Sequence, residues 1–157
     1  MLDSGILRKA EINDLQKIVE IENICFDYNI AYTTYQLKYL LTKANSHCLV
    51  EETDKNIRGF IIVLYNKRTK VAGIETLNVN PVYQGYGIGK KLLLGAEEDI
   101  FSKNIKKIRL EVSTGNIPAI KLYQKSGFRV SGILKDYYYH NHFGTKNAYR
   151  MVKELTT

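Results

Sequence analysis

The stretch Asn80-Pro81-Val82-Tyr83-Gln84-Gly85-Tyr86-Gly87-Ile88-Gly89-Lys90 decides how this 157-residue chain is interpreted. Glycine stands at every second position from Gly85 to Gly89, directly before a segment of helical period. Glycines let a backbone turn tightly and approach a ligand closely. The first turn of a helix adds free N–H groups and a partial positive charge. The stretch therefore predicts a phosphate-binding loop, although a loop that needs glycine only for close packing is the alternative.

Two common phosphate loops do not fit this stretch. A Walker A loop needs G-x-x-x-x-G-K-[ST], but here its first glycine would be Gln84 and its hydroxyl residue Lys91. The dinucleotide fingerprint needs a glycine where Lys90 stands, and its loop follows the strand directly. In this chain Asn80–Gln84 separate the loop from the preceding strand. The spacing therefore belongs to another kind of phosphate loop.

Outward from the loop, hydrophobic periodicity predicts a mixed α+β fold. Val71–Val79 is typical of a strand, 87–102 of an amphipathic helix and Lys107–Ser113 of a further strand. Such a unit joins parallel strands, whereas the short turns before it predict an antiparallel meander. The other expected strands are 6–10, 47–52, 59–65, 128–134 and 148–155. The other expected helices begin at Asn13 (capped with Gln16), at Thr33 or Thr34, and at Pro118.

Length and composition predict a single domain spanning 1–157. The chain is 45% hydrophobic and 25% charged, which is ordinary for a globular protein. No apolar run reaches the roughly 18 residues that span a membrane, and the first residues lack the apolar stretch of a signal peptide. Cys25 and Cys48 have no metal-ligand spacing, which predicts free core thiols in a reducing compartment. We therefore expect a cytoplasmic protein.

The net charge of +7 predicts an anionic partner. Nucleic acid, a membrane surface, an acidic protein and a phosphate-bearing cofactor all meet that requirement. No basic stripe alternates with stacking aromatic residues, so we expect neither a specific nucleic acid nor a membrane partner.

Two motifs in the same order resemble those of the GNAT superfamily of N-acyltransferases. The first is Gln-x-x-Gly-x-Gly at Gln84, Gly87 and Gly89, and the second is Leu-Glu-Val at 110–112, then Asn116, then Ala-x-x-x-Tyr and Gly-Phe within 119–128. The resemblance implies the GNAT fold, with a mixed, mostly antiparallel sheet of about six or seven strands and about four helices. It also implies acetyl transfer from acetyl-CoA, which leaves coenzyme A as the product.

A narrower resemblance is to the RimI-type and archaeal protein N-terminal acetyltransferases. It rests on Leu-Glu-Val, Ala-Ile-x-Leu-Tyr and the pair Tyr137-Tyr138. Asp136 stands where that family often has glycine, and Thr114-Gly115 departs from its usual Arg/Ala-Ser. These departures leave the catalytic pattern intact and concern substrate preference.

The resemblance implies direct attack in a ternary complex, with Glu111 as the base and Tyr123 as the acid that protonates the leaving thiolate. A modest base suffices for an N-terminus, because a peptide α-amine has a pKa of about 7.7–8 and a lysine side chain about 10.4. The alternatives are that Glu111 only orients the substrate, that Glu75 is the base, and that Tyr123 is a core residue with a satisfied hydroxyl.

The resemblance also implies where the ligands lie. The backbone of strand residues 77–79, just before the glycine loop, pairs with the amides of the pantetheine arm. The N–H of Val79 stabilises the oxyanion of the tetrahedral intermediate, and the N–H groups of the loop hold the pyrophosphate. The expected cofactor-binding residues are Leu77, Asn78, Val79, Gln84, Gly85, Tyr86, Gly87, Ile88, Gly89, Lys90, Asn116 and Tyr123. The expected substrate-binding residues are Glu22, Phe26, Tyr28, Tyr32, Glu75, Tyr137 and Tyr138. His140 and His142 are interpreted as solvated loop residues, so no metal is expected.

The expected substrate is thus the N-terminal α-amine of a protein, with the ribosome or a ribosomal protein as a candidate partner. The alternative is a small amine (a polyamine, an antibiotic or a metabolite) or a lysine side chain. A polyamine site would need more acidic residues than loop 135–147 offers, since Asp136 is its only one.

Overall fold

The computed structural model describes residues 2–54 and 56–156, which form one seven-stranded sheet in the order β1-β2-β3-β4-β5-β7-β6. Only the β4–β5 pair is parallel among the pairs of these strands. The strands are β1 (Ile6–Lys9), β2 (Ser46–Thr53), β3 (Asn56–Asn66), β4 (Val71–Val79), β5 (Lys107–Ser113), β6 (Arg129–Leu134) and β7 (Ala148–Glu154). The expected α+β fold with a mixed, mostly antiparallel sheet is confirmed.

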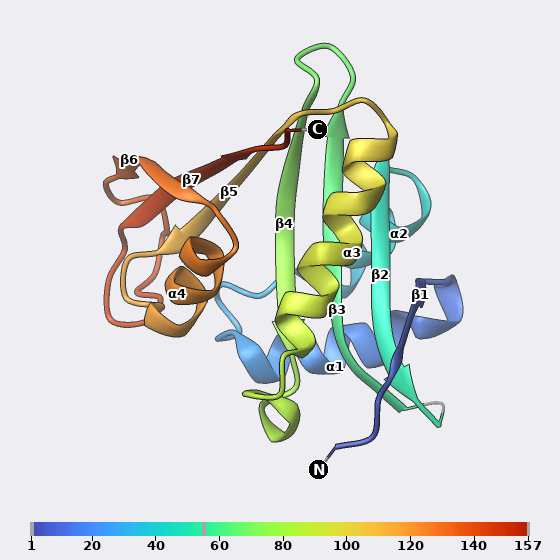
Figure 1. The fold of residues 1–157 in the computed structure, drawn as a ribbon. Helices are drawn as coiled ribbons and strands as arrows, with labels where there is room; N and C mark the ends of the chain where they lie inside the picture. Colours follow the sequence, from blue (N-terminus) through green and yellow to red (C-terminus); the bar gives the residue numbers. More distant parts are fainter. Residues whose placement is uncertain (1, 55, 157) are drawn as a thin grey trace.

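Helices cover both faces of the sheet, as Figure 1 shows. They are α1 (Leu15–Cys25), α2 (Thr34–Thr42), α3 (Ile88–Ser102) and α4 (Ile117–Lys125). Alternate residues of β3 divide the apolar core in two: Ile61 and Val63 pack on the α3 side, and Phe60 and Ile62 on the α1 and α2 side. Within the described residues, no helix is both long and apolar enough to cross a membrane.

A fork between β4 and β5 creates space for a site. The two strands pair from Val71 to Ile74 on β4 and from Lys107 to Leu110 on β5. Directly after this pairing, β4 bulges: Ile74 lies opposite Val63 and Thr76 opposite Ile62, so Glu75 is the extra residue. Beyond the bulge β4 still pairs with β3, while its other edge is open. Glu75 and Glu111 therefore stand at the point where the strands separate.

The start of the first helix differs from the prediction. Instead of a helix capped by Asn13, a 3-10 turn spans Ile12–Asp14 and α1 begins at Leu15. The Asp14 carboxylate accepts the main-chain N–H of Glu11 at 2.7 Å and is bound by both terminal nitrogens of Arg8 at 2.9 Å. The ion pair with Arg8 and the contact with Glu11 together outweigh the capping preference of Asn13. The second helix is capped as expected, because Thr33 and Gln36 form a capping box.

A buried ion pair supports the sheet beneath the first turn of α3. Arg58 Nε donates to Glu51 Oε1 at 2.8 Å, and both side chains are almost fully buried. Lys91 of α3 lies 3.7 Å from the same carboxylate, and its ammonium also donates to the carbonyl of Gly5. The pair thus ties β2, β3 and the N-terminal segment to the helix that follows the glycine loop.

We expect Arg58→Met to destabilise the protein by about 3 kcal/mol, because it leaves the Glu51 carboxylate buried with only Lys91 nearby. Replacing both partners, as in Arg58→Met/Glu51→Leu, removes that uncompensated charge and recovers most of the loss. Urea unfolding of the two variants and the wild type measures both effects. Equal stability of Arg58→Met and the wild type would contradict the prediction.

Candidate functional site

Two cavities meet inside the fork. A groove of about 620 Å³ runs from the glycine loop along the open edge of β4, and a cavity of about 270 Å³ continues it between β4 and β5. Side chains from α1, β4 and α4 form the shared wall. These shared residues are Phe26, Leu77, Asn116, Ala119 and Tyr123.

The glycine loop forms one end of the groove. Gly85 and Gly87 both have φ of +86°, a conformation that side chains rarely adopt. Gly87 is the N-cap of α3, and the first helical bond runs from the Lys91 N–H to the Gly87 carbonyl. In the described part of the chain, the N–H groups from Gly85 to Lys90 have no protein acceptor. They form a cradle for an anion, strengthened by the helix dipole.

The open edge of β4 forms the middle of the groove. The Asn80 N–H donates to Arg58 on β3, and N–H groups alternate between the two edges of a strand, so that of Val79 faces the fork. The Val79 carbonyl accepts from Gln84 Nε2 at 2.9 Å and from Cys25 Sγ at 3.4 Å. Burial raises the pKa of Cys25 to about 11, so Cys25 is a thiol rather than a nucleophile. Cys25 and Cys48 are both unpaired, as expected.

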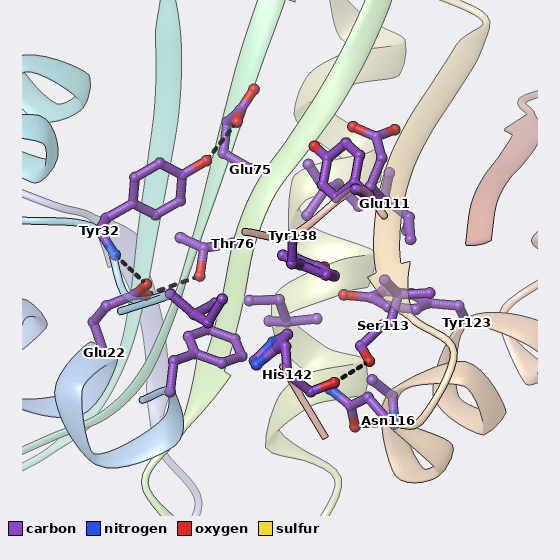
Figure 2. Close-up of a pocket in the computed structure, with 18 residues that line it drawn as sticks. Glu22, Tyr32, Glu75, Thr76, Glu111, Ser113, Asn116, Tyr123, Tyr138 and His142 are labelled. Carbon is purple, nitrogen blue, oxygen red and sulfur yellow. Dashed lines mark hydrogen bonds between the residues drawn. The ribbon is translucent and has the colours of Figure 1, made fainter. Parts of the chain in front are cut away.

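Tyr123 of α4 points its hydroxyl into the junction of the two cavities (Figure 2). The residue is buried, yet no described residue hydrogen-bonds this hydroxyl. Burial, with a contribution from Tyr138, raises the pKa of Tyr123, so it holds its proton. No buried side-chain oxygen or nitrogen of the described residues lacks a partner, so this unpartnered hydroxyl is open to the cavity, where it is a donor available to a ligand. Nearby, Asn116 Oδ1 caps α4 by accepting the Ala119 N–H at 3.4 Å.

The two carboxylates of the fork lie at the other end of the small cavity (Figure 2). Glu75 accepts a hydrogen bond from the Tyr32 hydroxyl at 2.8 Å. Glu111 is bound by two arginines, Arg150 Nε at 3.3 Å and Arg109 Nε at 3.6 Å. The cavity therefore has an acidic end and, at the Tyr123 end, a proton donor.

Glu22 lies in the cavity wall but has its carboxylate fully engaged. The side chain is only 1% exposed and accepts from the Tyr32 N–H at 3.0 Å, from Thr76 Oγ1 at 3.0 Å and from Asn78 Nδ2 at 2.6 Å. Burial raises the pKa of Glu22, which these hydrogen bonds partly offset. Glu22 thus fastens α1 and Tyr32, two residues before α2, to the bulged part of β4.

His142 is the main residue that the sequence interpretation missed. It was expected to be a solvated loop residue, but it is 5% exposed and lines the small cavity. Its ring packs against Phe26 of α1, Tyr138 and Phe143, with centroid distances of 5.1, 4.9 and 4.6 Å. This aromatic cluster joins loop 135–147 to α1 across the fork. Alternating polarity in the loop gives no sign of it, because the contacts span distant segments.

The same loop is anchored to the end of β5. Ser113 Oγ donates to the His142 carbonyl at 2.6 Å, and the Thr114 N–H donates to the Asn147 carbonyl at 3.0 Å. Gly115 lies so close to the Phe143 backbone that any Cβ would overlap the Phe143 carbonyl. The glycine at this position is therefore required by the loop packed upon it.

Most predicted site residues line one of the two cavities. Tyr28 does not, being 92% exposed, and Tyr86 borders a neighbouring hollow instead of the groove. The groove contains the predicted residues Leu77, Asn78, Val79, Gln84, Gly85, Gly87, Ile88, Gly89, Lys90, Asn116 and Tyr123. The small cavity contains the predicted residues Glu22, Phe26, Tyr32, Glu75, Glu111, Tyr137 and Tyr138.

Comparison with known proteins agrees with this geometry. The family model described as the acetyltransferase (GNAT) family matches residues 15–128. The chain belongs to the GNAT acetyltransferase family. This family uses acyl-coenzyme A, and the groove with its unpaired backbone N–H groups lies where the glycine motif predicts it.

Relatives of this family member include RimI-type and archaeal proteins. The chain is 30% identical to the putative [ribosomal protein bS18]-alanine N-acetyltransferase of Bacillus subtilis, over 90% of this chain and 91% of the relative. It is 27% identical to an N-alpha-acetyltransferase of Sulfurisphaera tokodaii, over 84% of both chains. The solved PaiA N-acetyltransferase of Thermoplasma acidophilum, in complex with coenzyme A, has the same fold, with a TM-score of 0.78 at 24% identity over 97% of this chain and 99% of that one.

The buried His142 predicts a pH dependence of stability. Burial lowers the pKa of His142, while Asp27 raises it by a smaller amount. A histidine with a lowered folded-state pKa is protonated first in the unfolded chain, so its contribution to stability holds above about pH 6.5 and is lost as the pH falls below that value. Urea unfolding at pH 7.5 and 5.5 should therefore show a smaller loss of stability at pH 5.5 for His142→Phe than for the wild type.

The exposed His140 provides the matched control for this measurement. His140→Phe should lose as much stability as the wild type between the two pH values. An identical loss for His142→Phe and His140→Phe would rule out the assigned role of the buried ring.

Proposed function

We propose that this protein transfers the acetyl group of acetyl-CoA to the N-terminal α-amine of a polypeptide. The observation that carries the proposal is the small tyrosine-lined cavity at the end of the groove, with the unpartnered Tyr123 hydroxyl at the junction. Its volume of about 270 Å³ is at the low end for ligand sites, and Tyr32, Tyr137 and Tyr138 give it aromatic walls with polar tips. Such walls suit a short stretch of neutral backbone.

The groove fits coenzyme A by the chemistry of its donors. The N–H groups of Gly85–Lys90 suit a diphosphate, and open space lies where Cβ atoms at Gly85 and Gly87 would stand. The open edge of β4 at 77–79 offers backbone groups to the amides of a pantetheine arm, as an added strand would use them. When bound, acetyl-CoA supplies the thioester that carries the acetyl group.

Tyr123 is the proposed acid. Its unpartnered O–H faces the cavity, holds its proton and donates it to the sulfur of the departing thiolate. The alternative, a core tyrosine whose hydroxyl is satisfied by protein, is disfavoured because no described residue bonds that hydroxyl.

Glu111 is the proposed base, accepting the proton of the incoming ammonium directly or through a water, so that the neutral amine attacks. Arg109 and Arg150 hold its carboxylate at the mouth of the cavity. Glu75 is the competing candidate, and it accepts only one neutral hydrogen bond, from Tyr32. The two carboxylates lie at the same fork, so the roles of Glu75 and Glu111 have to be distinguished by substituting each in turn.

A polyamine acceptor is less well matched by the cavity. Its three lining carboxylates are all engaged: Glu22 by three hydrogen bonds, Glu75 by Tyr32 and Glu111 by two arginines. A substrate with several ammonium groups would have to compete with each of these partners.

The first experiment measures release of free coenzyme A thiol from acetyl-CoA. The acceptors are peptides with varied first residues, the same peptides with a blocked α-amine and an internal lysine, and spermidine. We expect turnover with free α-amines and at least tenfold less with the blocked peptides or spermidine. Turnover restricted to spermidine or to the lysine side chain would refute the proposal.

The roles of the three side chains are tested by kinetics of conservative variants. Tyr123→Phe should lower kcat about 100-fold with acetyl-CoA affinity unchanged, since general acids contribute about 10²–10⁴-fold. Tyr39→Phe, which removes an exposed hydroxyl on α2, is the matched control and should retain the full rate.

Glu111→Gln and Glu75→Gln are compared in the same assay across pH. The variant that lacks the base should lose rate at neutral pH and regain part of it as rising pH deprotonates the amine. If only Glu75→Gln behaves in this way, the base is Glu75; if neither does, no carboxylate of the fork is the base.

A further inference from the structure

A second groove, of about 740 Å³, adjoins the acidic end of the small cavity. It lies between the β3–β4 turn and the β5–β7–β6 part of the sheet. Glu75 lines both this groove and the small cavity, so the two adjoin at this side chain, and among the described residues that line the groove it is the only carboxylate. Six cationic side chains line it: Lys67, Arg68, Lys107, Arg109, Arg129 and Arg150.

Strand register brings cations from three strands to one face. Arg109 and Arg129 both lie opposite Val152 on β7, and Arg150 lies opposite Glu111 on β5. Along β5, Ile108 and Leu110 alternate with these positions and point into the core. The cations are therefore exposed on the other face, Arg129 by 66% of its side chain.

Part of this charge has no protein partner. Arg109 and Arg150 bind Glu111, and Arg129 lies 4.0 Å from Glu154. Within the described residues, no carboxylate comes within 4.0 Å of Lys67, Arg68 or Lys107. A groove whose cations exceed its carboxylates attracts an anionic ligand.

The small cavity determines what that ligand is. With about 270 Å³ it has room for only the first part of a polypeptide, and the basic groove adjoins it at Glu75, within reach of the chain that follows. The groove is a poorer match for a single-stranded nucleic acid, because single strands bind through stacking of their bases on exposed aromatic rings. Among the described residues that line the groove, Tyr65 is the only aromatic one, and it is buried.

We propose that the basic groove binds acidic side chains of the substrate polypeptide a few residues after the acetylated amine. This inference rests on the proposed function and adds a preference for an acidic downstream segment. The groove acts through long-range and exposed ion pairs, so the preference raises kcat/KM modestly and falls with salt.

The test uses two peptides with the same three first residues, chosen from those that are acetylated, followed by Asp-Glu-Asp or by Asn-Gln-Asn. For the wild type at 50 mM salt we expect kcat/KM to be about fivefold higher for the acidic peptide, and less than twofold at 500 mM salt. In Arg68→Gln/Lys107→Gln the preference should fall below twofold, while the rate with the neutral peptide stays unchanged. The matched control Lys38→Gln/Lys43→Gln removes two exposed lysines of the α2 region and should keep the preference.

Equal kcat/KM for the two peptides in the wild type would overturn the inference and leave the proposed function standing. If neither peptide is acetylated, the proposed function fails, and a direct binding measurement then tests whether the groove prefers an acidic peptide. Fluorescence anisotropy then compares the labelled acidic and neutral peptides and a labelled single-stranded oligonucleotide. Tighter binding of the acidic peptide, weakened in Arg68→Gln/Lys107→Gln, supports the groove, whereas tighter binding of the oligonucleotide or no difference between the peptides overturns it.

Discussion

The separation of two parallel strands is the constraint on which the rest of the structure depends. β4 and β5 pair only as far as Ile74 and Leu110, and β4 bulges at Glu75 directly after this pairing. Paired strands would leave no room between them, and an unpaired edge buried without a ligand would be costly. The fork therefore supplies both the space and the unsatisfied backbone groups of the site, and the two acidic side chains stand there because they are the next residues along each strand.

Three sets of contacts position the walls of the fork. On one side, the buried Glu22 carboxylate fastens α1 to β4 through hydrogen bonds with Thr76 and Asn78. On the other side, Ser113 and Thr114 hold loop 135–147 at the end of β5. Across the gap, His142 packs against rings from both sides. Polar groups thus position each wall, and an aromatic contact spans the opening without closing it.

The sequence predicts the strands, the helices and the tight glycine loop before α3 well, because each depends on local periodicity or on glycines at fixed spacing. The interpretation fails where other contacts compete with the expected local preference. Asn13 is a good capping residue, but the neighbouring Arg8 and Glu11 engage Asp14 and move the start of α1. His142 sits in a polar loop, and only the folded positions of Phe26 and Tyr138 make it a buried residue. The sequence does not predict the basic groove for a similar reason, because its cationic side chains come from four separate segments that only the folded arrangement of the strands brings together.

Gly115 has a consequence for engineering this site. Its Cα is in contact with the Phe143 backbone, so residue 115 and the course of the loop are inseparable. A loop from a relative with serine at this position could not simply replace 135–147, nor could serine be introduced while the present loop is kept. Changing the acceptor preference by loop exchange would require both segments to be moved as one cassette.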